Sequence, residues 1–112
     1  QFVGFDRRAW HAGRSRWWDG HRERRELNDF SIGIELEGDE IHAYREAQYR
    51  CLARVFLALH ARYPALTLAR VTSHARIAPL RKTDPGPAFD WAYFRQCVQA
   101  LTTQASDARA CV

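Results

Sequence analysis

One long amphipathic pattern, from Arg45 to about Tyr63, occupies the middle of the chain, and its apolar face has to be buried. A row of arginines occupies the opposite face of this pattern. The apolar residues that recur at helical spacing are Leu52, Val55, Phe56, Leu59 and Tyr63. Pro64 follows the last turn and cannot continue a helix. The pattern therefore predicts an amphipathic helix that packs on a sheet.

The segment before this helix alternates with a period of two. One face carries Phe30, Ile32, Ile34 and Leu36, and the other carries Ser31, Gly33, Glu35 and Glu37. We predict a half-buried strand at 30–38 and a shorter strand at 68–73 that ends beside His74. Because Gly33 has no side chain, another backbone or a ligand can approach the face that carries Glu35.

A second helical stripe follows a proline-rich loop. Asp90 is a suitable N-cap, and the stripe consists of Trp91, Phe94, Val98 and Leu101. Strands and helices in this order predict an α/β fold with a central mixed sheet and helices packed on it. Residues 102–112 are expected to form a frayed C-terminal tail.

The length of 112 residues allows one domain with a single modest core. No apolar run approaches the roughly 18 residues that a membrane span requires, so we expect a soluble protein with no membrane partner. Cys51, Cys97 and Cys111 are an odd number without metal-type spacing. We expect buried or free thiols, which favours a reducing compartment.

The formal charge of +4 is concentrated in the first quarter of the chain, where arginines alternate with tryptophans. Such a pattern occurs in nucleic-acid-binding proteins. However, five acidic residues lie among these arginines and no nucleic-acid-binding motif follows: Asp6, Asp19, Glu23, Glu26 and Asp29. We therefore expect no nucleic-acid partner, and an anionic small ligand and a solvated loop both remain open.

Lys82 is the only lysine among 17 basic residues. An ammonium is a compact charge that can approach one developing oxyanion, whereas a guanidinium is broad and planar. His74 and Asp84, both residue types that bind zinc, stand on either side of it. The segment is either a zinc site or a surface loop in which one lysine occurs by chance.

These residues can be combined into a metal-hydrolase site. His74 and Asp84 would hold zinc, Glu35 would take a proton from the attacking water, and Lys82 would hold the oxyanion. A catalytic zinc normally has three protein ligands, and the sequence supplies two candidates.

Three ordered motifs carry a resemblance to a known family: residues 5–13 around Trp10, residues 28–38 around Glu35, and residues 74–91. They resemble the zinc-dependent N-acetylmuramoyl-L-alanine amidases, in particular those that act on 1,6-anhydro-muropeptides. The resemblance extends over residues 1–101, which it marks as part of an amidase domain, with 102–112 as a tail. It implies the fold shared by these amidases and the peptidoglycan recognition proteins.

The resemblance also implies an activity: hydrolysis of the amide between the muramic acid lactyl group and L-alanine of the stem peptide, in cell-wall recycling. The implied cofactor is Zn²⁺, the implied partner is a muropeptide, and we expect a cytoplasmic monomer. By motif, the zinc ligands are His74 and Asp84, and the catalytic residues are Glu35 and Lys82. The substrate-binding positions are Ala9, Trp10, His11 and Arg81, although Trp10 is equally compatible with the core.

The sequence departs from the family pattern in two places. The family's third zinc ligand is a histidine on an early strand, which this sequence lacks, so we expect a domain without its N-terminal part and with weak zinc binding. The loop at 14–27 is longer than in the family, which leaves Arg24 and Arg25 as candidates for the peptide carboxylates. A non-catalytic muropeptide-binding module of the same fold is the alternative, but binding alone requires neither Glu35 nor Lys82.

Overall fold

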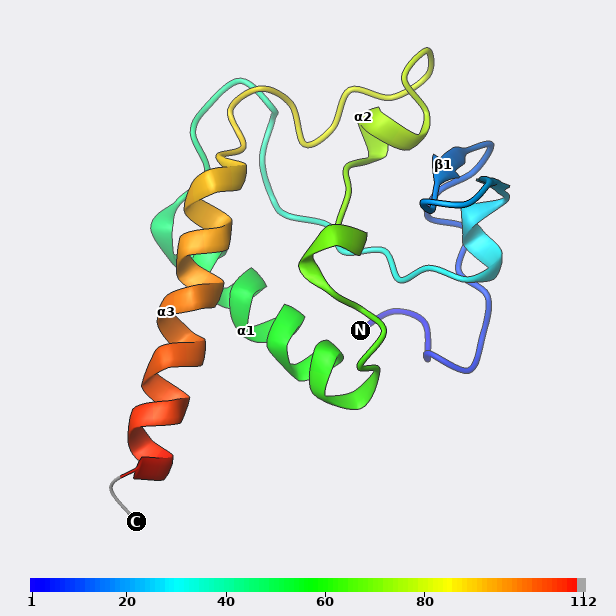
Figure 1. Ribbon diagram of the computed structural model, residues 1–112. Coiled ribbons are helices and arrows are strands. Elements are labelled where there is room, and N and C mark those ends of the chain that lie inside the picture. Colours follow the sequence, from blue (N-terminus) through cyan, green and yellow to red (C-terminus); the bar gives the residue numbers. More distant parts are fainter. Residues whose placement is uncertain (111–112) are drawn as a thin grey trace. The chain divides into compact units, whose positions relative to one another are not determined.

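The computed structural model (Figure 1) describes residues 1–110. The chain divides into two compact units. The first unit consists of residues 1–37 and 72–86. The second consists of residues 38–71 and the segment from residue 87 onward. All of the candidate site residues belong to the first unit, whereas the long helices belong to the second.

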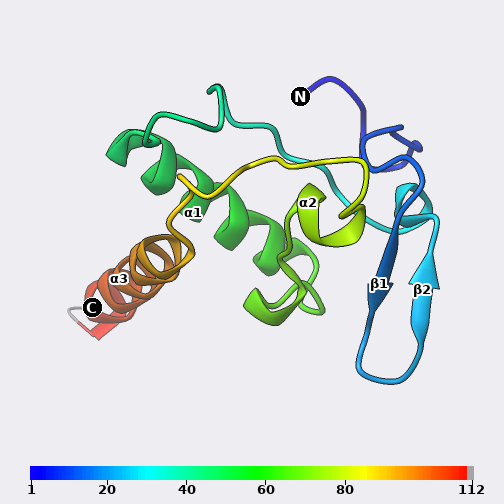
Figure 2. The ribbon, with the colours of Figure 1, turned by 90° about the horizontal axis from the view of Figure 1, so that it is seen from above.

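The first unit contains an antiparallel hairpin of two short strands, β1 (Arg16–Trp18) and β2 (Glu23–Arg25), which Figure 2 shows as paired arrows. The carboxylate of Asp19 accepts from the N–H groups of His21 and Arg22 at 2.9 and 3.0 Å and closes the turn. These two bonds hold the pKa of Asp19 at about 2.

Two short helices complete this unit, the 3₁₀-helix η1 (Leu27–Asp29) and the one-turn helix α2 (His74–Ile77). A small core of Ala12, Leu27 and Ile77 joins them, with Trp17 of β1 packed against it. Ala12 is only 2% exposed, so the chain around it is fixed in place by burial as well as by hydrogen bonds.

The second unit is built on α1 (Glu46–Arg62) and α3 (Trp91–Ala110), which pack on each other, with the 3₁₀-helix η2 (Leu68–Arg70) between them in the sequence. Both helices carry buried apolar residues, Ala53 and Phe56 on α1 and Phe94 and Val98 on α3, and the centroids of the Phe56 and Phe94 rings lie 6.3 Å apart. The hydroxyl of Tyr49 accepts from the Asp90 N–H at 2.8 Å and ties α1 to the start of α3.

The two predicted helices are confirmed. The first occupies 46–62, and Asp90 caps the second, since its carboxylate accepts from the Tyr93 N–H at 2.9 Å. The helix continues to Ala110, however, so the expectation that 102–110 is frayed was wrong. Residues 102–110 contain no glycine or proline that would end a helix.

The α/β class is also confirmed, with a sheet that is small and antiparallel. The predicted strands at 30–38 and 68–73 were wrong. Residues 31–36 have no strand pairing, and two side chains of the predicted buried face, Phe30 and Ile34, are 41% and 46% exposed. Within residues 1–110 the only ladder joins β1 to β2, and a segment without a hydrogen-bonded neighbour is not a strand.

Two of the three cysteines lie in the described part of the chain, and both are free, Cys51 exposed and Cys97 buried. This agrees with the expectation of unpaired thiols, whereas Cys111 lies outside the described residues. Among residues 1–110, no helix combines the length and the apolar character that a membrane crossing requires.

Candidate functional site

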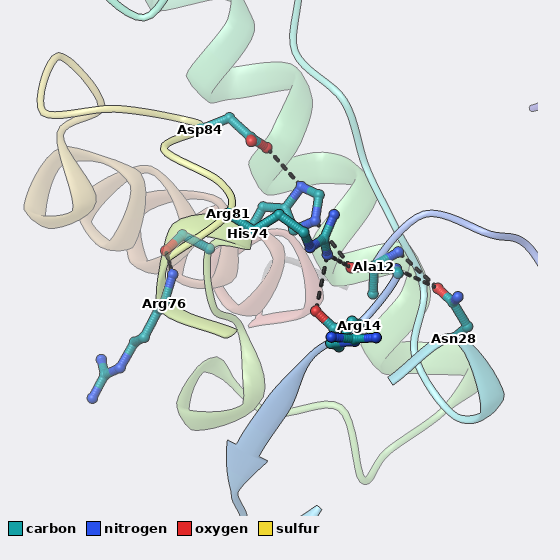
Figure 3. A network of polar contacts seen from close by, with 9 residues as sticks. Ala12, Arg14, Asn28, His74, Arg76, Arg81 and Asp84 are labelled. Atoms are coloured by element: carbon teal, nitrogen blue, oxygen red, sulfur yellow. Dashed lines mark hydrogen bonds and ion pairs between the residues drawn. The ribbon is translucent and has the colours of Figure 1, made fainter. Parts of the chain in front are cut away.

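His74 and Asp84 are brought together by the local structure around α2. Ser73 caps this helix, with its hydroxyl accepting from the Arg76 N–H at 3.1 Å, so His74 occupies the first turn. The loop then returns, because the Asp84 carbonyl accepts from the Ala75 N–H at 2.9 Å. As a result His74 Nδ1 lies 3.2 Å from Asp84 Oδ2 (Figure 3). The predicted proximity of the two side chains is confirmed.

The second ring nitrogen of His74 shows which tautomer is present. Nε2 lies 3.1 Å from the carbonyl oxygen of Ala12, which can only accept, so Nε2 carries a proton. In a neutral ring the Nδ1 lone pair then faces a carboxylate. A metal ion bound between Nδ1 and the carboxylate would satisfy both groups.

The donor pair fits zinc in its chemistry and its spacing. Zinc bonds to imidazole nitrogen and carboxylate oxygen are about 2.0–2.2 Å long, so two ligand atoms 3.2 Å apart can share one ion. Within the described residues, no third histidine, cysteine, aspartate or glutamate joins them in a metal-binding group. The structure therefore supplies two neighbouring donors.

The segment that offers the Ala12 carbonyl is fixed from both sides. The buried amide oxygen of Asn28 accepts from the N–H groups of Ala12 and Gly13 at 2.7 and 3.3 Å. The Ser15 hydroxyl donates to the Gly13 carbonyl at 3.0 Å and accepts from the Leu27 N–H at 3.2 Å. Sequence reasoning passed over Asn28 and Ser15, although Asn28 stands inside one of the motifs.

His11 lies against the backbone at Gly33, where a Cβ atom would meet the ring at 2.6 Å. The open position predicted at Gly33 is thus occupied by a side chain, not by backbone or ligand. The Ser31 hydroxyl donates its only hydrogen to the Leu27 carbonyl at 2.6 Å. In its 2.7 Å contact with His11 Nε2 the same hydroxyl must therefore accept, so Nε2 carries the proton. Burial lowers the pKa of His11. The interaction with the Ala9 backbone raises this pKa, and the nearby His74 lowers it further.

Glu35 and Lys82 stand on different segments of the same unit. Glu35 is exposed in the extended segment 31–36, and Lys82 is half-buried in the turn after α2, where its N–H donates to the Ala78 carbonyl at 2.9 Å. Neither side chain forms an ion pair with another described residue. Their predicted catalytic roles stay predictions.

A family model described as N-acetylmuramoyl-L-alanine amidase matches residues 1–87. The chain belongs to this amidase family. It is 57% identical over 98 residues to 1,6-anhydro-N-acetylmuramyl-L-alanine amidase AmpD of Citrobacter freundii, which covers 88% of this chain and 50% of that protein. The resemblance seen in the three motifs is therefore confirmed, and the chain spans about half the length of this relative.

Two solved structures are similar to this chain. A selenomethionine derivative of AmpD matches with a TM-score of 0.78 and 57% identity, covering 88% of this chain and 52% of that one. AmpDh3 from Pseudomonas aeruginosa in complex with anhydromuramic pentapeptide matches with a TM-score of 0.70 and 36% identity, covering 85% and 39%.

The amidase motif residues expected to meet the substrate are placed as follows. Trp10 is 77% exposed, so the alternative that it belongs to the core is wrong. Its ring is covered by the Arg8 guanidinium at 4.1 Å, which also pairs with Asp29 at 3.0 Å. Ala9 is half-buried beside it, and Arg81 is exposed, with its guanidinium on backbone carbonyls.

The two arginines proposed for the peptide carboxylates, Arg24 and Arg25, differ in the contacts and exposure of their side chains. Arg24 pairs with Asp19 at 3.4 Å and lies 4.4 Å above the Phe30 ring. Arg25 is the more exposed of the two and contacts Glu23 at 3.2 Å on its own strand. An incoming carboxylate would compete with one weak surface pair at Arg25 and with two contacts at Arg24.

Proposed function

We propose that the chain is part of a zinc hydrolase that cleaves the amide between N-acetylmuramic acid, in its 1,6-anhydro form, and L-alanine of the stem peptide. The observation that carries this proposal is the His74–Asp84 pair, 3.2 Å apart, with the other imidazole nitrogen held by a carbonyl. The names of the AmpD relatives and the muropeptide bound by AmpDh3 support the substrate class.

The chain's own residues would divide the reaction between them. His74 Nδ1 and Asp84 Oδ2 would hold Zn²⁺, which when bound polarises the scissile carbonyl and acidifies water. Glu35 would accept a proton as water adds to the carbonyl carbon and return it to the departing nitrogen of L-alanine. Lys82 would hold the oxyanion until the C–N bond breaks, leaving a carboxylate and an amine.

Substrate binding would use the exposed residues of the first motif. The exposed Trp10 ring, with the Arg8 guanidinium on it, would contact the anhydro-sugar, and Ala9 and His11 would form the adjoining wall. Arg81 would contribute positive charge to the same region. We also propose a cytoplasmic location, which the free thiols Cys51 and Cys97 support, and a monomeric state.

A non-catalytic muropeptide-binding module remains the second candidate, favoured by the finding that only two metal donors gather among the described residues. The deciding experiment supplies excess zinc and an anhydro-muramoyl-L-alanyl peptide. Calorimetry measures binding, and mass spectrometry measures the released peptide. We expect slow release by the wild type and none by Glu35→Gln, with binding retained in both. Binding without release in the wild type would establish the module instead.

A further inference from the structure

Arg81 stands beside the His74–Asp84 pair, but its guanidinium is held by backbone from a distant part of the sequence. Its Nη2 donates to the carbonyl of Ala12 at 2.6 Å and to the carbonyl of Arg14 at 2.9 Å (Figure 3). Both hydrogens of that nitrogen are therefore in use. The two carbonyls lie on either side of Gly13, so one side chain spans three residues of backbone.

The backbone at Gly13 is shaped to receive this guanidinium. A Cβ atom at Gly13 would lie 2.8 Å from Arg81 Nη2 and 3.2 Å from Cζ, so the guanidinium would have to shift to make room for it. Gly13 also has a φ of 60°, in the left-handed region that favours glycine. Close approach and backbone conformation thus both depend on the absence of a side chain there.

The Ala12 carbonyl connects Arg81 to His74, since it accepts from Arg81 Nη2 and from His74 Nε2–H at the same time. A carbonyl oxygen has two lone pairs, and here each has its own donor. The direction of this carbonyl sets the plane of the imidazole, and with it the direction in which Nδ1 faces Asp84. The position of Arg81 can therefore affect His74 through the carbonyl that both side chains share.

We propose that Arg81 is a positioning residue, which clamps the segment 12–14 so that the Ala12 carbonyl orients His74 with Nδ1 toward Asp84. The consequence for catalysis rests on the proposed use of His74 as a zinc ligand, whereas the clamp itself does not. Partners that hold the second nitrogen of a metal-binding histidine fix its tautomer and ring plane. For His74 this partner is the Ala12 carbonyl, which accepts a hydrogen bond from Arg81.

The test uses the chain without metal or substrate, in the presence of a chelator, and measures proton exchange with solvent by NMR. The protons observed are His74 Nε2–H and the amides of Ala12 and Gly13. In Arg81→Met we expect exchange of all three to accelerate about tenfold, the effect of losing roughly one net hydrogen bond. Arg81→Lys should restore part of the protection, since an ammonium can still donate to a carbonyl.

Arg76→Met is the matched control, because Arg76 is an exposed arginine of α2 whose side chain points away from this cluster (Figure 3). It should leave all three protons unchanged. Unchanged protection of His74 Nε2–H in Arg81→Met would overturn the proposal. So would equal acceleration at the Phe30 amide, which bonds the Leu27 carbonyl at 3.2 Å, because Arg81 would then only stabilise the unit as a whole.

Gly13→Ala provides a second route if Arg81→Met does not fold. The added methyl group would displace the guanidinium while leaving its charge in place, and we expect the same local acceleration at His74 Nε2–H. Protection equal to that of the wild type would refute the clamp. If the wild type neither binds zinc nor cleaves a muropeptide, the proposed function is wrong, and the exchange result still decides the role of Arg81.

Discussion

His11 and His74, both in the first unit, stand in opposite electrostatic surroundings. Both nitrogens of His74 face acceptors, the Ala12 carbonyl and the Asp84 carboxylate, so this ring is placed to share a cation. His11 donates through Nε2, while its Nδ1 is buried and forms no regular hydrogen bond with the described residues. Burial lowers its pKa, which favours the neutral form of the ring. A neutral His11 adds no positive charge beside a cation at His74.

At Lys82 we predict that replacement by arginine is harmful, although arginine is the chain's usual cation. A guanidinium is broader and spreads its charge, so the donor would be misplaced relative to the oxyanion. Loss of one well-placed donor typically costs about 10²–10³ in kcat. Steady-state kinetics on an anhydro-muramoyl-L-alanyl peptide with zinc supplied checks this. Near wild-type kcat would remove Lys82 from the mechanism, and an effect on KM alone would assign it to substrate binding.

At Asn28 we predict a loss of stability. Asn28→Ala leaves the Ala12 and Gly13 N–H groups without their acceptor in a buried position, which should cost about 1–3 kcal/mol in the free energy of unfolding. Asn28→Asp keeps the accepting oxygen and should be less harmful. Denaturant unfolding of both variants measures the difference. An alanine variant as stable as the wild type would show that water replaces the amide there.

The elements differ in how far the sequence alone determines them. The helices α1 and α3 were predicted because their stripes and the Asp90 cap are local features. The strand at 30–38 was not correct, because alternation specifies two faces but not a hydrogen-bonded neighbour. The approach of His74 to Asp84 was predictable from the motif. The roles of the Ala12 carbonyl and of Arg81 were not, because a backbone acceptor leaves no mark in the side-chain pattern.

At the level of elements, α2 should depend on its cap. Ser73→Ala removes the oxygen that accepts from the Arg76 N–H, a change that typically costs about 1 kcal/mol. Because His74 is the next residue, we expect the loss to appear as lower zinc affinity as well as lower stability. Ser73→Asp should retain the cap. If Ser73→Ala loses stability but binds zinc as well as the wild type, the cap does not contribute to the metal site.

At the scale of the whole molecule, two His–Asp pairs occur among the residues that the structure describes, and they provide an internal comparison. His42 Nδ1 lies 2.6 Å from Asp39 Oδ2, closer than in the His74 pair, but the His42 side chain is 84% exposed against 19% for His74. The other Asp39 oxygen accepts from the N–H groups of Ile41 and His42. The bonds to the His42 backbone and side chain and to the Ile41 backbone lower the pKa of Asp39, so its charge is already satisfied by the local turn.

We therefore predict that zinc binds weakly, and at the His74 pair only. Two donors should give a dissociation constant above about 1 µM, or less than about 8 kcal/mol of binding free energy, compared with about 10–16 kcal/mol for complete structural sites. Calorimetry on the wild type, His74→Ala and His42→Ala measures this. Binding should disappear in His74→Ala and remain in His42→Ala, because only His74 is oriented by a second hydrogen bond, from Nε2–H to Ala12. Tight stoichiometric zinc in the wild type, or its loss in His42→Ala, would contradict the assignment of His74 and Asp84.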